Sequence, residues 1–149
     1  MIALIIDQEI KQAMLAKDQT RLRGLRAIKA ALLLAKTEKG QVGEINEEGE
    51  IKILQRLVKQ RKESAQIYKD QGRDDLFQLE QEEIDVIQQF LPQQLDSEGI
   101  AAVVSRIIAE TGATSIKEMG KVMGLANKEL AGRAEGKLIG EIVKAKLTL

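Results

Sequence analysis

Residues 46–72 read NEEGEIKILQRLVKQRKESAQIYKDQG, and their pattern is that of one long helix. Asn46 is a suitable N-cap, and glutamates follow it in the first turn, where the helix dipole favours anions. Apolar residues then recur at helical spacing as far as Tyr68, and Gly72 is typical of a helix end. At 1.5 Å per residue this helix would be roughly 39 Å long, so one end is expected to project from a small domain.

Further helical patterns lie on both sides of this segment. The spacing of apolar residues predicts helices over residues 4–17, 20–38 and 74–90, with Asp18 as a cap for the second. The glycines at positions 40 and 43 indicate a loop over residues 41–46. Long neighbouring helices with short connections favour antiparallel packing, so residues 1–91 are predicted to form a bundle of about four helices.

The single proline of the chain, Pro92, interrupts the helical pattern. We therefore expect two helical domains, residues 1–91 and residues 96–149, in an all-α protein. In the second domain Asp96 or Ser97 would cap the first of three short helices, and Ser115 with Glu118 has capping-box spacing for the second. The residues predicted to face the core of this domain are Ile100, Val103, Val104, Ile107, Ile108, Met119, Val122, Met123, Ala126, Leu130, Leu138, Ile142 and Ala145.

The composition excludes several kinds of chemistry. The 149 residues include 23 Lys and Arg, 23 Asp and Glu, and no His, Cys or Trp. A chain without Cys and His has no thiolate nucleophile, no Cys-based zinc site and no Ser-His dyad, so we expect no metal, no cofactor and no catalytic site. The sequence has neither an apolar run near the roughly 18 residues of a membrane span nor a signal-peptide pattern. We expect a cytoplasmic protein with no membrane partner.

An acidic stretch and a basic stripe each have two interpretations. The acidic residues of 74–85 suit either a magnesium site or, as we favour, a solvated helix face. Glu83 lies inside an apolar stripe, so if it is buried it needs a cation, and we expect Arg26 to be its partner. The basic stripe either contacts phosphates or, as we favour, pairs with that acidic helix. The acidic residues are Asp74, Asp75, Glu80, Glu82, Glu83 and Asp85, and the basic ones are Arg21, Arg23, Arg26, Lys29, Lys36 and Lys39.

A second basic set follows Gly112. It contains Lys117, Lys121, Lys128, Arg133, Lys137, Lys144 and Lys146. Two glycine-flanked turns lie among these cations, and glycine allows a backbone to come close to a ligand. A phosphate-binding surface is one interpretation, and the expected contacts are Lys121, Lys128, Arg133 and Lys137. A purely structural interpretation instead makes Gly132 a helix C-cap and Gly136 a close-packing position.

Around these residues the chain resembles the GatB/YqeY family. The C-terminal signature consists of Met119-Gly120-Lys121-Val122-Met123 and Gly132-Arg133-Ala134-Glu135-Gly136-Lys137. The central pattern of the free-standing YqeY-like proteins is matched by Lys59-Gln60-Arg61-Lys62-Glu63-Ser64, by Tyr68, Gly72, Arg73, Glu80, Glu83 and Ile84, and by Phe90-Leu91-Pro92-Gln93-Gln94-Leu95. The resemblance runs from about Ile6 to Leu147.

This resemblance implies two helical domains and a function. The C-terminal domain would be related to the tail of the B subunit of the glutamine-dependent aspartyl/glutamyl-tRNA amidotransferase, a tail that helps to engage tRNA. The catalytic part of that subunit has no counterpart in this sequence, so a label such as carbon–nitrogen ligase with glutamine as amido donor would be inherited from the family. The first hypothesis is therefore a non-catalytic protein that interacts with tRNA or another RNA.

Two alternatives stay open. One is an amidotransferase-associated activity, either as an accessory to a partner enzyme or with a nucleophile from Ser64, Ser97, Ser105 and Ser115. The other is a protein-interaction module that uses the end of the long helix around residues 59–68. The sequence does not decide the oligomeric state.

Overall fold

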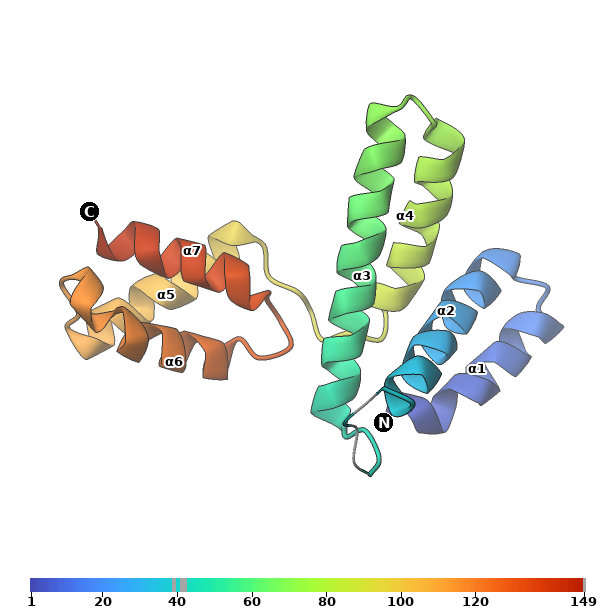
Figure 1. Cartoon of the computed structure of the whole chain (residues 1–149), viewed down its shortest axis with the longest axis horizontal. Helices are drawn as coiled ribbons and strands as arrows, with labels where there is room; N and C mark the ends of the chain where they lie inside the picture. Colours follow the sequence, from blue (N-terminus) through green and yellow to red (C-terminus); the bar gives the residue numbers. More distant parts are fainter. Residues whose placement is uncertain (39, 41–42, 149) are drawn as a thin grey trace. The chain divides into compact units, whose positions relative to one another are not determined.

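The computed structural model describes residues 1–38, 40 and 43–148. Within these ranges the chain forms seven α-helices, one short 3₁₀-helix and no β-strand, which confirms the all-α class (Figure 1). Lys39 and the Gln41–Val42 part of the predicted loop lie outside the described residues. Backbone contacts group the chain into two compact units, Met1–Leu91 and Pro92–Leu149, and each has its own hydrophobic core.

The N-terminal unit consists of two helix pairs. α1 (Ile2–Leu15) packs against α2 (Gln19–Lys36), and α3 (Glu47–Asp70) packs against α4 (Asp74–Gln88). α2 also contacts α3 and α4, so the two pairs share one core, while the α3–α4 pair extends beyond α2 (Figure 1). The largest fully buried apolar side chains of this core are those of Leu25, Ile28, Leu54, Ile84 and Ile87.

Side-chain caps fix the start of two of these helices. An Asp18 carboxylate oxygen accepts a hydrogen bond from the Arg21 amide (3.1 Å), and the Asn46 side-chain oxygen accepts one from the Gly49 amide (2.8 Å). Both caps confirm the prediction from the sequence. Gly72 follows α3 with a φ of 71°, a left-handed conformation that favours glycine, so the long helix ends where the sequence indicates.

A buried carboxylate holds the start of α1. Glu50 of α3 is 1% exposed, and its two oxygens accept hydrogen bonds from the amides of Ile2 (2.8 Å) and Ala3 (2.7 Å). These amides are among the N-terminal donors that a helix leaves without a partner of its own, and the negative charge is favourable at that end. The contact explains why α1 starts at Ile2 and not at the predicted Leu4.

Gly24 brings α2 and α4 into close contact. A Cβ atom at this position would lie 2.5 Å from the Val86 Cβ and 2.6 Å from its Cγ1, well inside van der Waals contact. The Val86 Cβ is attached directly to the backbone of α4, so it cannot rotate away. The absence of a side chain at Gly24 is therefore a packing requirement of the α2–α4 interface.

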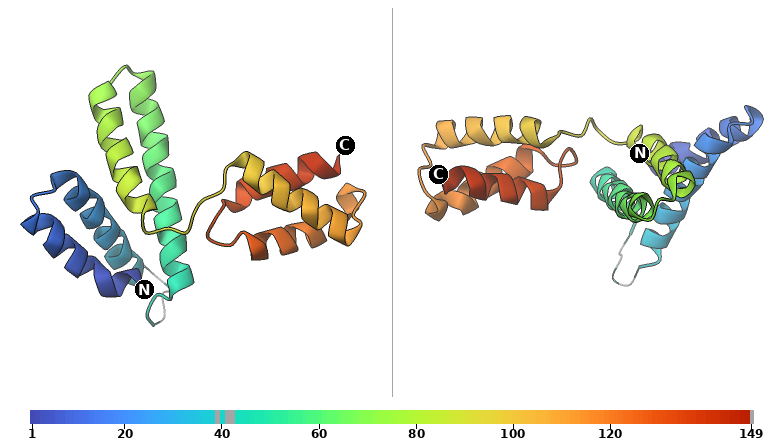
Figure 2. Two further views of the ribbon diagram at one scale, coloured as in Figure 1. Left: turned by 180° about the vertical axis from the view of Figure 1, so that it is seen from behind. Right: turned by 90° about the horizontal axis from the view of Figure 1, so that it is seen from above.

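The C-terminal unit is a three-helix bundle. α5 (Ser97–Thr111) is capped by Asp96, whose carboxylate accepts a hydrogen bond from the Gly99 amide (2.8 Å), and ends at the left-handed Gly112. A 3₁₀ turn, η1 (Ile116–Glu118), then leads into α6 (Met119–Glu129), and α7 (Gly136–Leu147) completes the unit. Within this unit α6 and α7 lie side by side, with α5 behind them (Figures 1 and 2).

The core of the C-terminal unit agrees with the sequence in α5 and α6 and differs in α7. Leu138 and Ile142 are half-buried and pack against the core, as predicted, but Ala145 is exposed, and the fully buried residues of α7 belong to another row. The apolar residues of α7 form two adjacent rows, and the periodicity alone does not show which row points to the centre of the bundle. The residues that are buried are Ile100, Val104 and Ile107 of α5, Val122 and Ala126 of α6, Leu130 just beyond it, and Ile139, Val143 and Leu147 of α7.

None of the described helices by itself has both the length and the hydrophobicity needed to cross a membrane. α5 meets that composition only together with residues 116–129, as a pair bent by 97°.

Candidate nucleic-acid interface

α6 presents a row of lysines to solvent. Val122 and Ala126 face the core, which turns the opposite side of the helix outward. Lys121 and Lys128 lie on that side two turns apart, and Lys117 precedes them in η1. All three are exposed. The structure therefore brings together two of the predicted contacts, Lys121 and Lys128.

α7 carries a second pair of lysines on its exposed side. Lys137 lies in the first turn, and Lys144 lies seven positions later on the same side of the helix. Glu141 is a surface neighbour of both lysines, because it is four positions from one and three from the other. This row therefore has a lower net positive charge than the row on α6.

The two rows border a common surface. Met123 of α6 packs against Gly140 of α7, where a Cβ would lie 3.6 Å from the Met123 Cε. Residues three or four positions apart are neighbours on a helix surface, so Lys137 and Lys144 flank this contact on α7. Gly120 and Asn127 flank the same contact on α6, and both are exposed. The lysine row of α6 and the lysine row of α7 therefore lie on the same side of the α6–α7 pair, with Gly120, Asn127 and Gly140 between them.

Among the described residues, no carboxylate forms an ion pair with these lysines. In the C-terminal unit Arg106 forms ion pairs with Glu110 and Glu129. Lys117, Lys121, Lys128, Lys137 and Lys144 are outside these pairs and exposed. Their positive charge is therefore available to a ligand.

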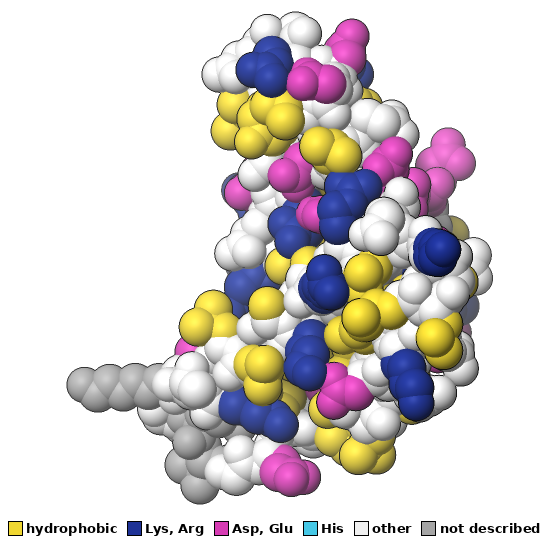
Figure 3. Space-filling model, turned by 90° about the vertical axis from the view of Figure 1, so that its right-hand side faces the viewer, with side chains coloured by type: hydrophobic (Ala, Val, Ile, Leu, Met, Phe, Trp, Pro, Cys, Tyr) yellow, Lys and Arg dark blue, Asp and Glu magenta, His cyan; other side chains and the backbone are white. Residues whose placement is uncertain are grey.

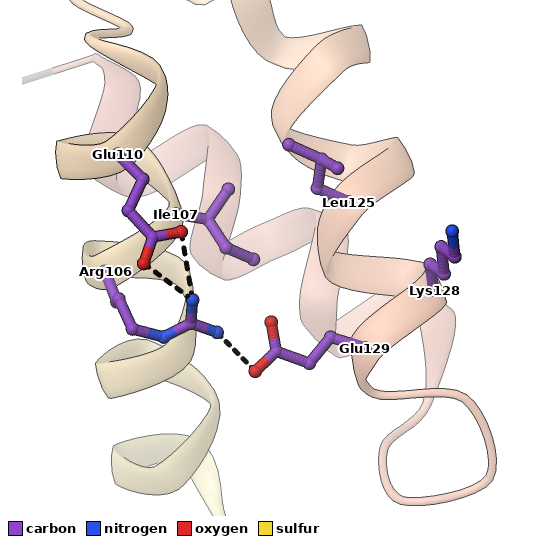
Figure 4. Close-up of a pocket in the computed structure, with 6 residues that line it drawn as sticks. All are labelled: Arg106, Ile107, Glu110, Leu125, Lys128 and Glu129. Atoms are coloured by element: carbon purple, nitrogen blue, oxygen red, sulfur yellow. Dashed lines mark hydrogen bonds and ion pairs between the residues drawn. The ribbon is translucent and has the colours of Figure 1, made fainter.

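Arg106 of α5 contrasts with the lysines. Its guanidinium donates to both carboxylate oxygens of Glu110 (3.0 Å each) and to Glu129 of α6 (Figure 4). The hydrogen bonds to Glu129 and Glu110 raise the pKa of Arg106 above its ordinary value. These residues line a groove of about 360 Å³ between α5 and α6, with Lys128 at its edge. Two carboxylates in this groove make it unsuitable for an anion, so we place the candidate interface on the α6–α7 side.

Arg133, a predicted contact, has a structural role in the turn between α6 and α7. Its side chain is half-buried, and its Nε donates a hydrogen bond to the Gln93 carbonyl (3.2 Å). The Arg133 carbonyl accepts from the Leu95 amide (2.9 Å), and the Gln94 side chain donates to the Gly132 carbonyl (2.6 Å). Arg133 thus fastens residues 93–95 to the turn. Gly132 has the left-handed φ of 78°, whereas Gly136 has open space around it and is not a close-packing position.

Three of the six cations of the basic stripe, all on α2, form ion pairs within the N-terminal unit. Arg23 forms an ion pair with Glu82 of α4 (2.8 Å), and Arg21 forms one with Glu9 of α1 (2.9 Å). Lys29 pairs with Asp7 of α1. Figure 3 shows this mixture of cationic, anionic and hydrophobic side chains on one face of the molecule. The predicted pairing with the acidic helix is therefore found for Arg23, whereas Arg21 and Lys29 pair with acids of α1.

The predicted partner of Glu83 is wrong. Arg26 is exposed, and Glu83 instead lies 3.4 Å from the Nε of Arg61 on α3. Arg61 also approaches Glu80 (3.9 Å), one turn away on α4. The reason is the pairing of α3 with α4, which places Arg61 beside the apolar stripe that contains Glu83. Across the described residues, no group of three or more carboxylates is arranged to hold a metal ion.

Replacing Gly124 of α6 by alanine is expected to increase the free energy of unfolding by about 0.5–1 kcal/mol. An added Cβ meets no atom within 4 Å, and glycine costs about this much relative to alanine inside a helix. Urea unfolding followed by circular dichroism measures the change. Gly112→Ala is the control with the opposite expected sign, because Gly112 has a φ of 70°. A loss of stability in Gly124→Ala would show that this surface is not open.

The comparison with family models gives one match. A family described as "Yqey-like protein" matches residues 5–147. No curated protein matches the chain.

Proposed function

The chain belongs to the YqeY-like family, and we propose that it is a cytoplasmic, non-catalytic protein that binds RNA through the lysine rows of α6 and α7. Transfer RNA is the first ligand to test, because the signature around Gly120 and Gly132 resembles the tRNA-engaging tail of the amidotransferase B subunit. The two rows are Lys117, Lys121 and Lys128, and Lys137 and Lys144.

The observation that carries this proposal is the unpaired state of the lysines. An exposed ammonium group without a carboxylate partner gains more from a phosphate than one that must first leave an ion pair. Arg106, Arg21 and Arg23 are all held by carboxylates, whereas Lys121 and Lys128 form no ion pair with any residue that the structure describes. The formal net charge of the whole chain is zero, so binding depends on this local surface and is expected to be weak at high salt.

The absence of an activated nucleophile supports the non-catalytic part of the proposal. The chain has neither His nor Cys, so a serine nucleophile would need another base, such as a lysine. Ser115 lies in the capping turn, where its amide donates to the Glu118 carboxylate (3.2 Å). Within the described ranges, no hydrogen bond joins Ser64, Ser97, Ser105 or Ser115 to a lysine. An assay for glutamine hydrolysis by the pure protein is expected to show none.

The double substitution Lys121→Gln with Lys128→Gln is expected to weaken tRNA binding by about tenfold or more. Each phosphate contact contributes close to one unit to the slope of log affinity against log salt, so the slope should fall by about 2. Fluorescence anisotropy with labelled tRNA over a series of salt concentrations measures both quantities.

The matched control removes two charges elsewhere. Lys11 of α1 and Lys62 of α3 are exposed, and the double substitution Lys11→Gln with Lys62→Gln should leave affinity and slope unchanged. An equal loss of affinity in the control variant would show that the binding site is not on α6. No binding of tRNA by the unchanged protein at low salt would refute the proposed function.

A second candidate function is protein binding by the end of the α3–α4 pair. Ile67 and Leu79 are 56% and 43% exposed there, which is high for large apolar side chains. An amidotransferase is one such partner, and the chain would then act as its accessory protein. Affinity purification from cells that scores both RNA and protein distinguishes the two candidates, and loss of a protein partner in Ile67→Ser would favour the second.

A further inference from the structure

We infer that the lysine rows of α6 and α7 bind the sugar–phosphate backbone of double-helical RNA in preference to single-stranded RNA. This inference rests on the proposed function and specifies the form of RNA that the face accepts. It follows from three features of the C-terminal unit. The unit lacks aromatic residues, its two arginines donate hydrogen bonds within the unit, and its exposed lysines lie in two rows.

The C-terminal unit has no aromatic side chain on which a base can stack. The aromatic residues of the chain are Tyr68, Phe77 and Phe90, and all three belong to the N-terminal unit. Proteins that bind single strands use base–aromatic stacking worth about 1–3 kcal/mol per base. Without stacking, little offsets the entropy lost when a flexible strand is ordered on the surface.

The side chains best suited to reading base edges are also occupied. The unit contains two arginines, whose planar groups suit bidentate contacts to guanine. Arg106 is held by Glu110 and Glu129, and Arg133 donates to the Gln93 carbonyl. Lysines form the remaining positive surface, and a lysine binds phosphate as a point charge without selecting a base.

The helices fix the backbone positions from which the lysine side chains extend. Lys121 and Lys128 are seven residues apart, as are Lys137 and Lys144, so each pair spans about 10.5 Å along its helix at 1.5 Å per residue. Packed helix axes are about 8–10 Å apart. Gly120, whose Cβ position is open, leaves no tall side chain between the rows. A duplex offers a dense and preformed array of phosphates, which the lysine side chains can reach without ordering a flexible RNA strand.

Glu141 provides an independent test of contact with the α7 row. Its carboxylate is a neighbour of Lys137 and Lys144 and opposes an approaching phosphate. Glu141→Gln is therefore expected to tighten duplex binding about two- to fivefold at low salt. Glu98→Gln, in the first turn of α5, makes the same charge change away from the two rows and should have no such effect.

The experiment measures anisotropy of three labelled probes of equal length with the full chain. These are a blunt RNA duplex, an unstructured single-stranded RNA and a DNA duplex of the same sequence as the RNA duplex. The RNA duplex is expected to bind at least about tenfold more tightly than the single strand. A second RNA duplex of unrelated sequence should agree with the first within about twofold, because base edges are not read.

The outcomes separate the two levels of the proposal. If neither RNA binds at low salt, the proposed function fails. If RNA binds but the single strand equals or exceeds the duplex, the proposed function stands and the inference is overturned. The DNA duplex carries a similarly dense array of phosphates, so it too should bind more tightly than the single strand, and its failure to do so would overturn the argument from phosphate density. Lys137→Gln with Lys144→Gln should lower the salt slope for the duplex by about 2, and an unchanged slope would remove the α7 row from the site.

Discussion

The substitution Glu50→Ala is expected to lower the free energy of unfolding of the N-terminal unit by about 3 kcal/mol. Glu50 is 1% exposed, and its removal leaves the amides of Ile2 and Ala3 without their carboxylate acceptors. Those amides are at a helix N-terminus, where their own helix offers no replacement. Urea unfolding followed by circular dichroism measures the loss, and amide hydrogen exchange should show it most strongly in α1.

Two further variants test this role of Glu50. Glu50→Gln keeps one oxygen acceptor and places an NH₂ group where the second oxygen was, so its loss should be smaller than that of alanine but still more than 1 kcal/mol. Glu47→Ala removes an exposed glutamate from the same first turn of α3 and should cost less than about 0.5 kcal/mol. Equal effects of Glu47→Ala and Glu50→Ala would show that the buried contact with α1 contributes nothing.

The substitution Gly24→Ala is expected to destabilise the N-terminal unit by about 1–3 kcal/mol. Alanine improves intrinsic helix propensity by about 1 kcal/mol, but its Cβ would lie 2.5 Å from the Val86 Cβ. The clash involves an atom fixed to the backbone of α4, so α2 and α4 must move apart, and the packing loss exceeds the propensity gain. The same unfolding measurement applies, with circular dichroism at equilibrium.

A double-mutant cycle identifies the cause. Val86→Ala does not remove the Cβ that meets position 24, but it removes the Cγ atoms at 2.6 and 3.1 Å and gives α4 room to shift. The cost of Gly24→Ala should therefore be smaller in the Val86→Ala background, with a coupling of about 1 kcal/mol. Additive effects of the two substitutions would show that the destabilisation by Gly24→Ala does not come from its contact with Val86.

Local signals in the sequence were sufficient for the helices and most of the core. Asp18, Asn46 and Asp96 are capping residues at the positions where their helices begin, because a cap depends on residues two or three positions away. The apolar rows of α5 and α6 likewise follow from periodicity within one helix. The division into domains at 1–91 and 96–149 stays a prediction.

The contacts between helices could not be predicted from the sequence. Glu50 lies in a glutamate-rich first turn that also suits the helix dipole, and nothing nearby shows that one of these acids is buried against residues 48 positions away. The partner of Glu83 depends on which helix packs against α4, so Arg61 could not be told from Arg26. In α7 two apolar rows compete, and only the position of α5 and α6 selects Ile139 and Val143.

The candidate interface was predictable in part for the same reason. Lys121 and Lys128 share a face by helical periodicity, and Lys137 shares one with Lys144. That the two faces border one surface depends on the packing of α6 against α7, and the hydrogen bond of Arg133 depends on the path of residues 93–95. The i, i+4 spacing of Arg106 and Glu110 was a signal that this arginine is paired.

The hydrogen bonds of residues 93–95 make this segment part of the C-terminal unit. The Leu95 amide donates to the Arg133 carbonyl, the Gln94 side chain donates to the Gly132 carbonyl, and the Arg133 side chain donates to the Gln93 carbonyl. A fragment that is meant to contain the intact C-terminal unit would therefore have to begin before Gln93, although α5 itself begins only at Ser97.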